Sequence, residues 1–485
     1  MYIITYLLKV VANLKYLLFR IICSVRDTAW VVMYPYADAD CFDTVFKKGL
    51  IQSSDKRVTR KNVRTFYKAV ENNDLKKLVS VVNPSLKVVD PLCFYSKQTY
   101  GPLCNTTVVD PPHSYSSREF ALNMLELYFM YLMRDVKFSE WSSYPIYSQC
   151  MDLMKSHDKK TRFNLRMNNK ANNINDNTYY VSQFLLQPVP YWQGGMDNKI
   201  KPYKHGSDTL TTIELYEQLH HYGVVPTIDI GPEATRRYIV TGRDLATMVH
   251  KDHPIQVTLG AYKLLNGVYP ESKKIFNKTL PITPFVDNGQ PLIELLITMA
   301  SMCVLRSAWY HKYHTFRVLR PEEFGYNVEK EIGKFNDVVL DKNNVILKEV
   351  NYRIGSHLLP GVYPEGCPAH PSFPSGHAVL AGAGITIIKA FFDEDYEIPH
   401  MIPNSAGDTL ETTSEKVKVG DELNKLAFNM AFGRNWAGIH YRMDAENGIK
   451  LGEHVAISIL RDYVKGCNAP VKFTFRSYFG DKITI

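Results

Sequence analysis

Lys312 and Arg320 are two basic residues that stand eight positions apart, and Pro321 follows directly. Eight residues are about two turns of an α-helix, so a helix here places both side chains on about the same face until Pro321 stops it. A lysine ammonium and an arginine guanidinium that point the same way can bind a tetrahedral oxyanion. Paired basic residues are also common on solvated helix faces, so this pair alone does not define a site.

A second segment, 370–377, has the sequence His-Pro-Ser-Phe-Pro-Ser-Gly-His and leads directly into an apolar stretch. Pro374 sets the entry to a helix, Ser375 can cap it, and Gly376 lets the backbone approach a ligand closely. The free N–H groups of a helix start bind anions, and His377 in the first turn can move a proton. The alternative is an ordinary capped helix start.

A third segment, 433–444, contains Arg434, His440 and Asp444. Arg434 adds another guanidinium group. On a helix, Asp444 lies one turn beyond His440 and can accept the Nδ1 proton, which leaves Nε2 as a nucleophile or a metal ligand. A histidine–aspartate pair at this spacing is also often a surface contact.

Together and in this order, the three segments resemble the vanadium-dependent haloperoxidases, which share a superfamily with type 2 phosphatidic acid phosphatases and bacterial acid phosphatases. The resemblance is closest to the bromoperoxidases of algae and cyanobacteria, and it extends from about Ser116 to the C-terminus. The Lys312–Arg320 spacing is one residue longer than in the phosphatases, as in the bromoperoxidase branch. Gly433 stands where the phosphatases have serine, so one hydroxyl is absent.

The resemblance implies that His440 binds vanadium through Nε2, with Asp444 as its partner, and that His377 is an acid/base catalyst paired with Asp252. Trp309 and His370 would line the halide side. The groups implied to hold vanadate are Lys312, Arg320, Ser375, Gly376, His377, Arg434 and His440.

The implied activity is that of a vanadate-dependent bromide peroxidase. Hydrogen peroxide would oxidise bromide or iodide to hypohalous acid, which halogenates small organic nucleophiles, with vanadium(V) as a Lewis acid. His370 is expected to favour bromide over chloride and, near its unperturbed pKa of ~6.5, to make activity pH-dependent. The alternative is a soluble acid phosphatase with His440 as phosphorylated nucleophile, which His370 and Trp309 disfavour. A non-catalytic bundle is disfavoured because every charged group of the pattern is intact.

The composition is that of a folded protein: 485 residues, 45% hydrophobic and 22% charged. The net charge of +8 is small for this length, and no nucleic-acid-binding motif accompanies it, so no nucleic-acid partner is expected. Eight cysteines without a Cys-x-x-Cys pair argue against a cysteine zinc site or a dithiol redox site. Cys93 and Cys104 could form a bridge, although scattered free thiols fit the pattern better.

Helical periodicity dominates the chain and predicts an all-α fold of helix bundles (two halves resembling four-helix bundles) with long loops and a few short strands. Short strands are expected over 338–345 and 471–485. A short helix is expected near 64–82, and the longer helices are expected over 118–135, 241–267, 290–317, 375–392, 420–430 and 446–465.

Residues 1–26 have the pattern of a basic amphipathic helix. We expect it to pack on the body or on another subunit, with membrane-surface attachment or targeting as the alternatives. No secretory signal or membrane span is expected, since the apolar stretch 378–388 is shorter than the ~20 residues that a span needs. We therefore expect a soluble homo-oligomer of undetermined compartment. Residues 1–112 form the lead-in and 113–485 the haloperoxidase-like domain, with the vanadate site within 300–450.

Overall fold

The structure, a computed structural model, describes residues 42–53, 57–95, 101–157, 179–223, 231–274, 285–286, 288–467 and 471–485. The expected amphipathic helix over 1–26 lies outside the described residues. The all-α prediction is confirmed, with three two-stranded hairpins as the sheet structure of the described residues. These hairpins are β1 (Val189–Tyr191) with β2 (Gly194–Met196), β3 (Glu397–Pro403) with β4 (Leu410–Lys418), and β5 (Thr474–Arg476) with β6 (Lys482–Thr484).

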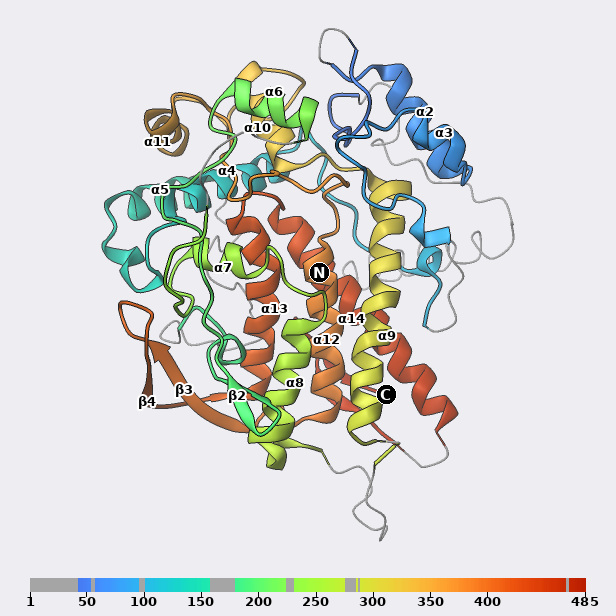
Figure 1. The fold of residues 1–485 in the computed structure, drawn as a ribbon, viewed down its shortest axis with the longest axis vertical. Coiled ribbons are helices and arrows are strands. Elements are labelled where there is room, and N and C mark those ends of the chain that lie inside the picture. The colour runs from blue at the N-terminus through green and yellow to red at the C-terminus, as the bar shows by residue number, and fades with distance from the viewer. Residues whose placement is uncertain are drawn as a thin grey trace, which may run out of the picture.

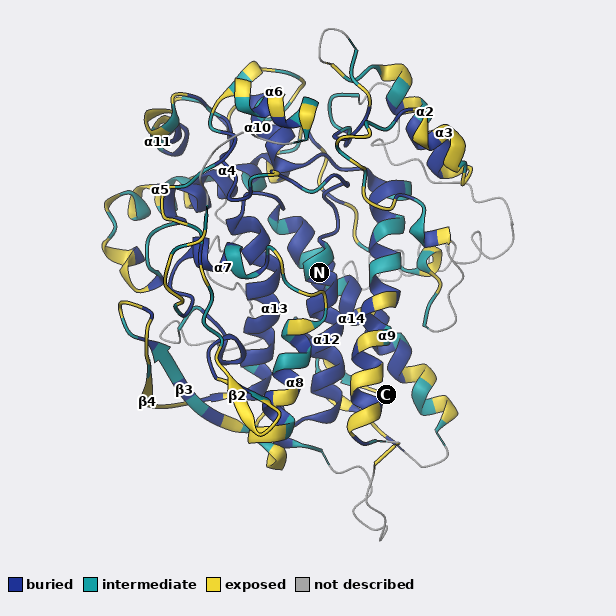
Figure 2. Ribbon diagram, in the orientation of Figure 1, coloured by how far each residue is buried: buried dark blue, intermediate teal, exposed yellow. Residues whose placement is uncertain are grey.

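Long helices pack side by side around one central apolar helix, α12 (Gly376–Phe391) (Figure 1). Every residue of α12 from Ala378 onwards is buried, which Figure 2 shows as an almost continuous dark blue ribbon. A helix that is apolar on all sides belongs in the interior of a bundle. Its neighbours in the bundle are α8 (Gln256–Val268), α9 (Gln290–Tyr310), α13 (Val419–Trp436) and α14 (Arg442–Gly466).

The remaining helices lie mainly at one end of this bundle (Figure 1). Ser117 caps one of them, because its hydroxyl accepts a hydrogen bond of 3.1 Å from the Phe120 backbone N–H. These helices are α2 (Arg60–Glu71), α3 (Leu75–Val79), α4 (Arg118–Met133), α5 (Pro145–His157), α6 (Ile213–Tyr222), α7 (Gly242–Met248), α10 (Pro321–Lys330) and α11 (Val345–Ile354). Short 3₁₀ turns cover Cys93–Tyr95, Cys104–Thr106, Phe138–Ser143, Gln183–Leu185 and Pro270–Ser272.

The prediction of one helix over 241–267 is wrong, because the structure has two helices there, α7 and α8. Between them lies a break around Asp252 and Pro254. Helix α7 ends at Met248, and α8 begins at Gln256. Pro254 lacks an N–H group and disfavours helical backbone in the residue before it, so one helix cannot run through this segment undisturbed. The break therefore places Asp252 on a connecting segment.

The prediction that one helix carries both Lys312 and Arg320 is also wrong. Helix α9 continues as a π-helical turn over His311–Phe316, and Arg317 then adopts a left-handed conformation with φ of 58°. Arg320 lies beyond this turn, and Pro321 is the first residue of α10. Proline is favoured at the first helical position because its missing N–H would have no partner there. Pro321 therefore starts a helix and does not stop one.

Two smaller predictions also need correction. The region near 64–82 contains two helices, α2 and α3, in place of one. The expected strand 338–345 is a turn that leads into α11, and the β3–β4 hairpin was not predicted. The expected C-terminal strand is confirmed as the β5–β6 hairpin. Cys93 and Cys104 are free thiols.

One helix among the described residues, 290–316, is long and apolar enough to cross a membrane by length and composition. A helix was expected over 290–317, but not as a candidate span. Half of its most apolar window is buried within the protein, and it packs against α12 and α14. Both observations are typical of a core helix of a folded domain.

Glycines let α12 and α14 approach each other backbone to backbone. A Cβ atom at Gly452 would lie 2.3 Å from the Val379 carbonyl oxygen, and one at Gly382 would lie 2.3 Å from that of Ile449. Both distances are far below van der Waals contact. The two helices can therefore keep this spacing only while these positions lack a side chain.

We predict that Gly452→Ala lowers the free energy of unfolding by about 1–3 kcal/mol, because the added methyl group overpacks the α12–α14 contact. Chemical denaturation followed by circular dichroism measures this change. Gly466→Ala in the same helix is the matched control, since nothing lies within 4 Å of a Cβ atom there. Equal stabilities of the two variants would contradict the close-packing interpretation.

Candidate active site

Arg320 is the residue at which the three segments of the sequence pattern meet. Its guanidinium group is fully buried, and Nη1 donates to the Ile439 carbonyl (2.7 Å) and to His440 Nε2 (3.0 Å). On the other side, Nε donates to the His370 carbonyl at 2.8 Å, and Nη2 lies 3.0 Å from His370 Nδ1. One side chain therefore links the residue before α10, the loop before α12 and the segment before α14.

Lys312 binds the same loop from the π-helical turn. Its ammonium group is buried and donates to the carbonyl oxygens of Pro371 (2.9 Å) and Ser372 (2.7 Å). Burial, with the positive charge of Arg320 as a second cause, holds the pKa of Lys312 well below its usual value of 10.5. A negative charge close to Lys312 would reverse this shift.

His440 is oriented by Asp444. The Nδ1 atom lies 2.8 Å from Asp444 Oδ2, which also accepts hydrogen bonds from the Ser372 hydroxyl and from the Tyr441 backbone N–H (3.1 Å). Nδ1 therefore carries the proton, and the lone pair of Nε2 faces Arg320. Burial, together with the Arg320 charge, lowers the pKa of His440 well below 6.5, so the ring is neutral.

The predicted helical relation between these two residues needs a correction in detail. Helix α14 begins at Arg442, so Asp444 lies in its first turn and His440 precedes the helix. The predicted contact is nevertheless present. Burial raises the pKa of Asp444 to about 6.

His377 and Asp252 form a second histidine–carboxylate pair. His377 Nε2 lies 2.8 Å from Asp252 Oδ1, and Asp252 comes from the break between α7 and α8. Burial and the nearby Arg434 lower the pKa of His377. Burial alone would raise the pKa of Asp252, but its contacts with His377 outweigh this effect and lower it. At neutral pH the pair is therefore a carboxylate that accepts the Nε2 proton of a neutral imidazole.

Two buried hydrogen-bond donors of the site have no partner in the described part of the chain, the Ser375 hydroxyl and Arg434 Nε. Two buried acceptors of the site, Asp252 Oδ2 and Asp444 Oδ1, also lack one there. The expected capping bond of Ser375 is absent, although Ser375 does occupy the position before α12. Arg434 donates from Nη1 to the Val249 carbonyl at 2.7 Å and to the Tyr363 hydroxyl at 3.3 Å. Buried polar groups are almost always satisfied, so the Ser375 hydroxyl and Arg434 Nε fit a ligand with acceptor oxygens.

The charges of the site favour an anion. Lys312, Arg320 and Arg434 are all buried here, and their counter-charge from the α14 side is Asp444. Across the described residues, no group of three or more histidine, cysteine or carboxylate side chains could hold a bare metal cation. An oxyanion with a metal centre that one imidazole could ligate fits this set of donors, because its oxygens take up the ammonium and guanidinium groups.

His370 and Trp309 lie beside these cations. Their ring centroids are 4.9 Å apart, and Lys312 Nζ lies 5.7 Å from the Trp309 ring centroid. Burial and the Arg320 charge hold the pKa of His370 well below 6.5. These surroundings therefore do not support the predicted titration of His370 across physiological pH. The structure places all the predicted site residues in one region, near the ends of α9, α12, α13 and α14, with Arg320 just before α10 and Asp252 on the segment between α7 and α8.

Sequence reasoning missed Ser372, which hydrogen-bonds Asp444, and Tyr363, which supports Arg434. Ser372 could have been found, because it lies inside the 370–377 segment. Tyr363 had no signal of its own, since no motif surrounds it and its contact with Arg434 spans 71 positions.

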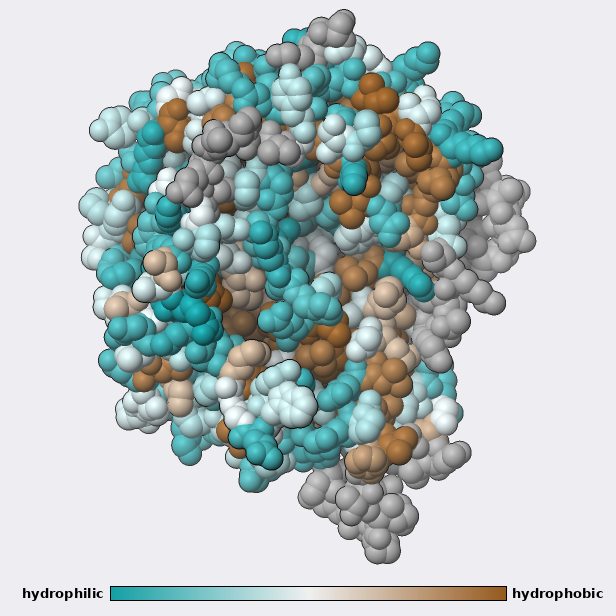
Figure 3. Space-filling view, in the orientation of Figure 1, coloured by the Kyte–Doolittle hydropathy of each residue, from teal (hydrophilic) through white to brown (hydrophobic). Residues whose placement is uncertain are grey.

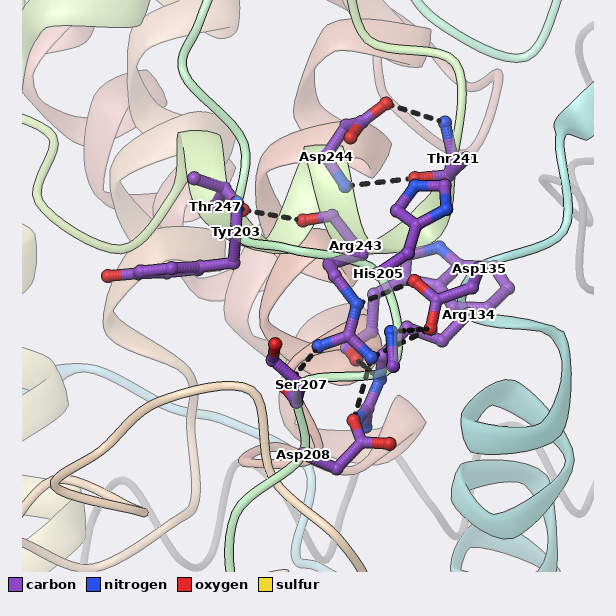
Figure 4. Close-up of polar contacts among 12 residues, drawn as sticks. Arg134, Asp135, Tyr203, His205, Ser207, Asp208, Thr241, Arg243, Asp244 and Thr247 are labelled. Atoms are coloured by element: carbon purple, nitrogen blue, oxygen red, sulfur yellow. Dashed lines mark hydrogen bonds and ion pairs between the residues drawn. The ribbon is translucent and has the colours of Figure 1, made fainter. Parts of the chain in front are cut away.

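A buried ion network fixes the elements around the break that carries Asp252 (Figure 4). Arg134 donates to the Trp436 carbonyl at the end of α13 and to Asp208, each at 2.9 Å. Arg243 of α7 binds the same Asp208 at 2.7 Å and also pairs with Asp135. The network therefore joins the end of α4, helix α7 and the end of α13, which carries Arg434.

Comparisons with known proteins agree with this arrangement. A family model described as the second helical-bundle domain of VCPO matches residues 293–466. The chain is 36% identical over 264 residues to the vanadium-dependent bromoperoxidase of Corallina officinalis, an alignment that covers 47% of this chain. The alignment spans 44% of that relative's length, so less than half of it is matched. Identity to the vanadium-dependent bromoperoxidase of Ascophyllum nodosum is 26% over 448 residues, 83% of this chain and 78% of that one.

The fold is shared with a solved structure, that of the homohexameric second vanadate-dependent bromoperoxidase of Ascophyllum nodosum. The TM-score is 0.86 at 23% sequence identity, and the match covers 96% of this chain and 87% of the other. At this level of identity, the likeness establishes the fold alone.

We predict that sulfate binds this site with net proton uptake and that its affinity falls as the pH rises from about 6 to about 9. Burial and the neighbouring cations lower the pKa values of Lys312, His370 and His440. A bound dianion would raise these pKa values, so protons should bind together with the anion. Calorimetric titration in two buffers of different protonation enthalpy measures the uptake. Lys312→Met should reduce it, and proton release on binding would contradict the prediction.

Proposed function

We propose that this chain, a relative of the vanadium-dependent haloperoxidases, is a vanadate-dependent bromide peroxidase. It would use hydrogen peroxide to oxidise bromide and iodide to hypohalous acid, which then halogenates small organic compounds. The observation that carries the proposal is the pair of unpartnered buried donors, the Ser375 hydroxyl and Arg434 Nε, among three buried cations. The three cations and two unused donors fit an anion with several oxygens, and His440 Nε2 offers one ligand to its centre.

In this proposal, vanadate binds at the N-terminus of α12. The residues assigned to its oxygens are Lys312, Arg320, Ser375, Gly376 and Arg434, with His377 close by and His440 as the ligand of vanadium. Bound vanadate would supply a Lewis-acidic vanadium(V) centre that activates peroxide, and the vanadium would keep its oxidation state. Asp444 holds the proton on His440 Nδ1, and so keeps the lone pair of Nε2 available.

His377 is assigned as the acid/base catalyst. Because its Nε2–H donates to Asp252, the lone pair lies on Nδ1, which can accept a proton from incoming hydrogen peroxide. The lowered pKa of His377 keeps this nitrogen unprotonated at neutral pH. Asp252 fixes the tautomer and stabilises the imidazolium that forms.

The halide side of the site is assigned to His370 and Trp309, which lie in contact beside Lys312. The domain assignment remains a proposal: a lead-in of residues 1–112 and a haloperoxidase-like domain of residues 113–485. The vanadate-binding residues fall within 300–450, while Asp252 lies outside this range.

We also propose that the chain forms homo-oligomers. The solved Ascophyllum nodosum relative is homohexameric. In this chain, Leu295 and Met302 of α9 are each 54% exposed, and apolar side chains gather on the face over α9 (Figure 3). Exposed apolar patches of this kind often become buried in subunit contacts.

The proposed activity is tested by bromination of a phenolic dye with hydrogen peroxide. We expect dye bromination only when both vanadate and bromide are present, and phosphate should compete with vanadate because it binds the same cations. Full activity of a vanadium-free, phosphate-saturated sample would contradict the proposal. Hydrolysis of an aryl phosphate without any halide oxidation would instead support the alternative, an acid phosphatase with His440 as nucleophile.

We predict that His440→Ala and His377→Ala both nearly abolish turnover, but for different reasons. His440→Ala removes the proposed ligand, so vanadate should be lost on equilibrium dialysis. His377→Ala should retain vanadate and slow turnover by ~10²–10⁴-fold, because the proton acceptor is missing.

The matched control is His253→Ala, since His253 is an exposed histidine next to Asp252. It should retain both vanadate and activity. If the His440 and His377 variants lost vanadate to the same extent, the division of roles between the two histidines would be wrong.

A further inference from the structure

A short segment of the lead-in, residues 86–90, touches both walls of the proposed halide side, and we call it the strap. The Val89 carbonyl accepts hydrogen bonds from Trp309 Nε1 (3.3 Å) and from the Tyr313 hydroxyl (2.7 Å). The Val89 N–H donates to the Ala369 carbonyl at 3.0 Å, one residue before His370. The backbone of one residue therefore connects the end of α9 to the His370 loop.

The backbone of the strap is shaped for this contact. Lys87 and Asp90 both adopt left-handed conformations, with φ of 43° and 45°, and so bend the chain on either side of Val88 and Val89. Gly49 supports the strap from behind, since a Cβ atom there would lie 2.7 Å from Val88 Cγ2. Non-glycine residues in the left-handed region carry a cost in conformational energy, which neighbouring contacts must offset.

A second residue of the lead-in holds the other side of the same loop. The Lys48 ammonium group is buried and pairs with Glu322 of α10 at 2.8 Å. It also donates to the carbonyl oxygens of Glu365 (3.1 Å) and Cys367. The chain from 365 to 370 is therefore held by Lys48 near its start and by Val89 near its end.

We propose that the strap is a positioning element for the halide side of the site. It sets the distance between Trp309 and the His370 loop and so determines how well the enzyme binds halide. Val89 makes no hydrogen bond to Lys312, Arg320 or Arg434 in the described structure. Changing the strap should therefore alter halide binding and leave vanadate binding intact. This inference rests on the proposed peroxidase function.

The test compares Val89→Pro with Val89→Ala in the full-length, vanadate-loaded protein. Proline removes the N–H group that binds the Ala369 carbonyl, whereas alanine keeps both backbone groups. We expect Val89→Pro to raise the Michaelis constant for bromide by about three- to tenfold, as the loss of one hydrogen bond suggests. The Michaelis constant for peroxide and the vanadate dissociation constant should stay within about twofold of wild type, and Val89→Ala should match wild type on all three.

Tyr313→Phe gives a second test if Val89→Pro does not fold, because it removes the hydroxyl that binds the Val89 carbonyl at 2.7 Å and lies 3.4 Å from the Ala369 carbonyl. It should change the bromide Michaelis constant in the same direction. Unchanged bromide constants in both variants, or an equal loss of vanadate affinity, would overturn the role of the strap. A wild-type protein that oxidises no halide would instead overturn the proposed function, so the two failures can be told apart.

Discussion

Three cations buried around one histidine–aspartate pair are the constraint on which the site depends. Removing a charge from water costs several kcal/mol unless partners compensate for it. Here the compensation comes from backbone carbonyls: those of Pro371 and Ser372 for Lys312, and those of His370 and Ile439 for Arg320. The surrounding loops are therefore shaped to direct carbonyl oxygens inward. The remaining positive charge makes the site a receptor for an anion.

The helix bundle brings the two histidine pairs together. The Ser375 N–H donates to the Asp444 carbonyl at 3.0 Å, which joins the starts of α12 and α14. A Cβ atom at Gly448 would lie 2.6 Å from that of Ala378, so the two helices are in close contact just beyond these starts. His377 from one helix start and His440 before the other therefore face one region. The glycines that let α12 and α14 pack closely in the core therefore also help to bring the site residues together.

The sequence predicts which residues lie together in the site better than it predicts their local backbone. Motifs such as the 370–377 segment carry their own signal, because their residue types and spacing lie within a few consecutive residues. The long apolar helices follow from periodicity alone. The π-helical turn and the strap depend on distant contacts, so no local pattern indicates them, whereas Pro254 is a local signal for the break between α7 and α8. From the sequence alone, Pro321 could either end one helix or begin another. The left-handed backbone of Arg317 separates the two helices, so Pro321 begins α10.

The π-helical turn over His311–Phe316 bears on how the site can change in evolution. A π-helical turn holds one more residue than an α-helical turn, so it absorbs a single-residue insertion without lengthening the helix axis. The resemblance seen in the sequence implies that the segment from Lys312 to Arg320 is one residue longer than in the phosphatases, and this turn is a place where one extra residue fits. Homologues can therefore vary in length here while both cations keep their places. Alignments that put the gap elsewhere would mismatch one of the two basic residues.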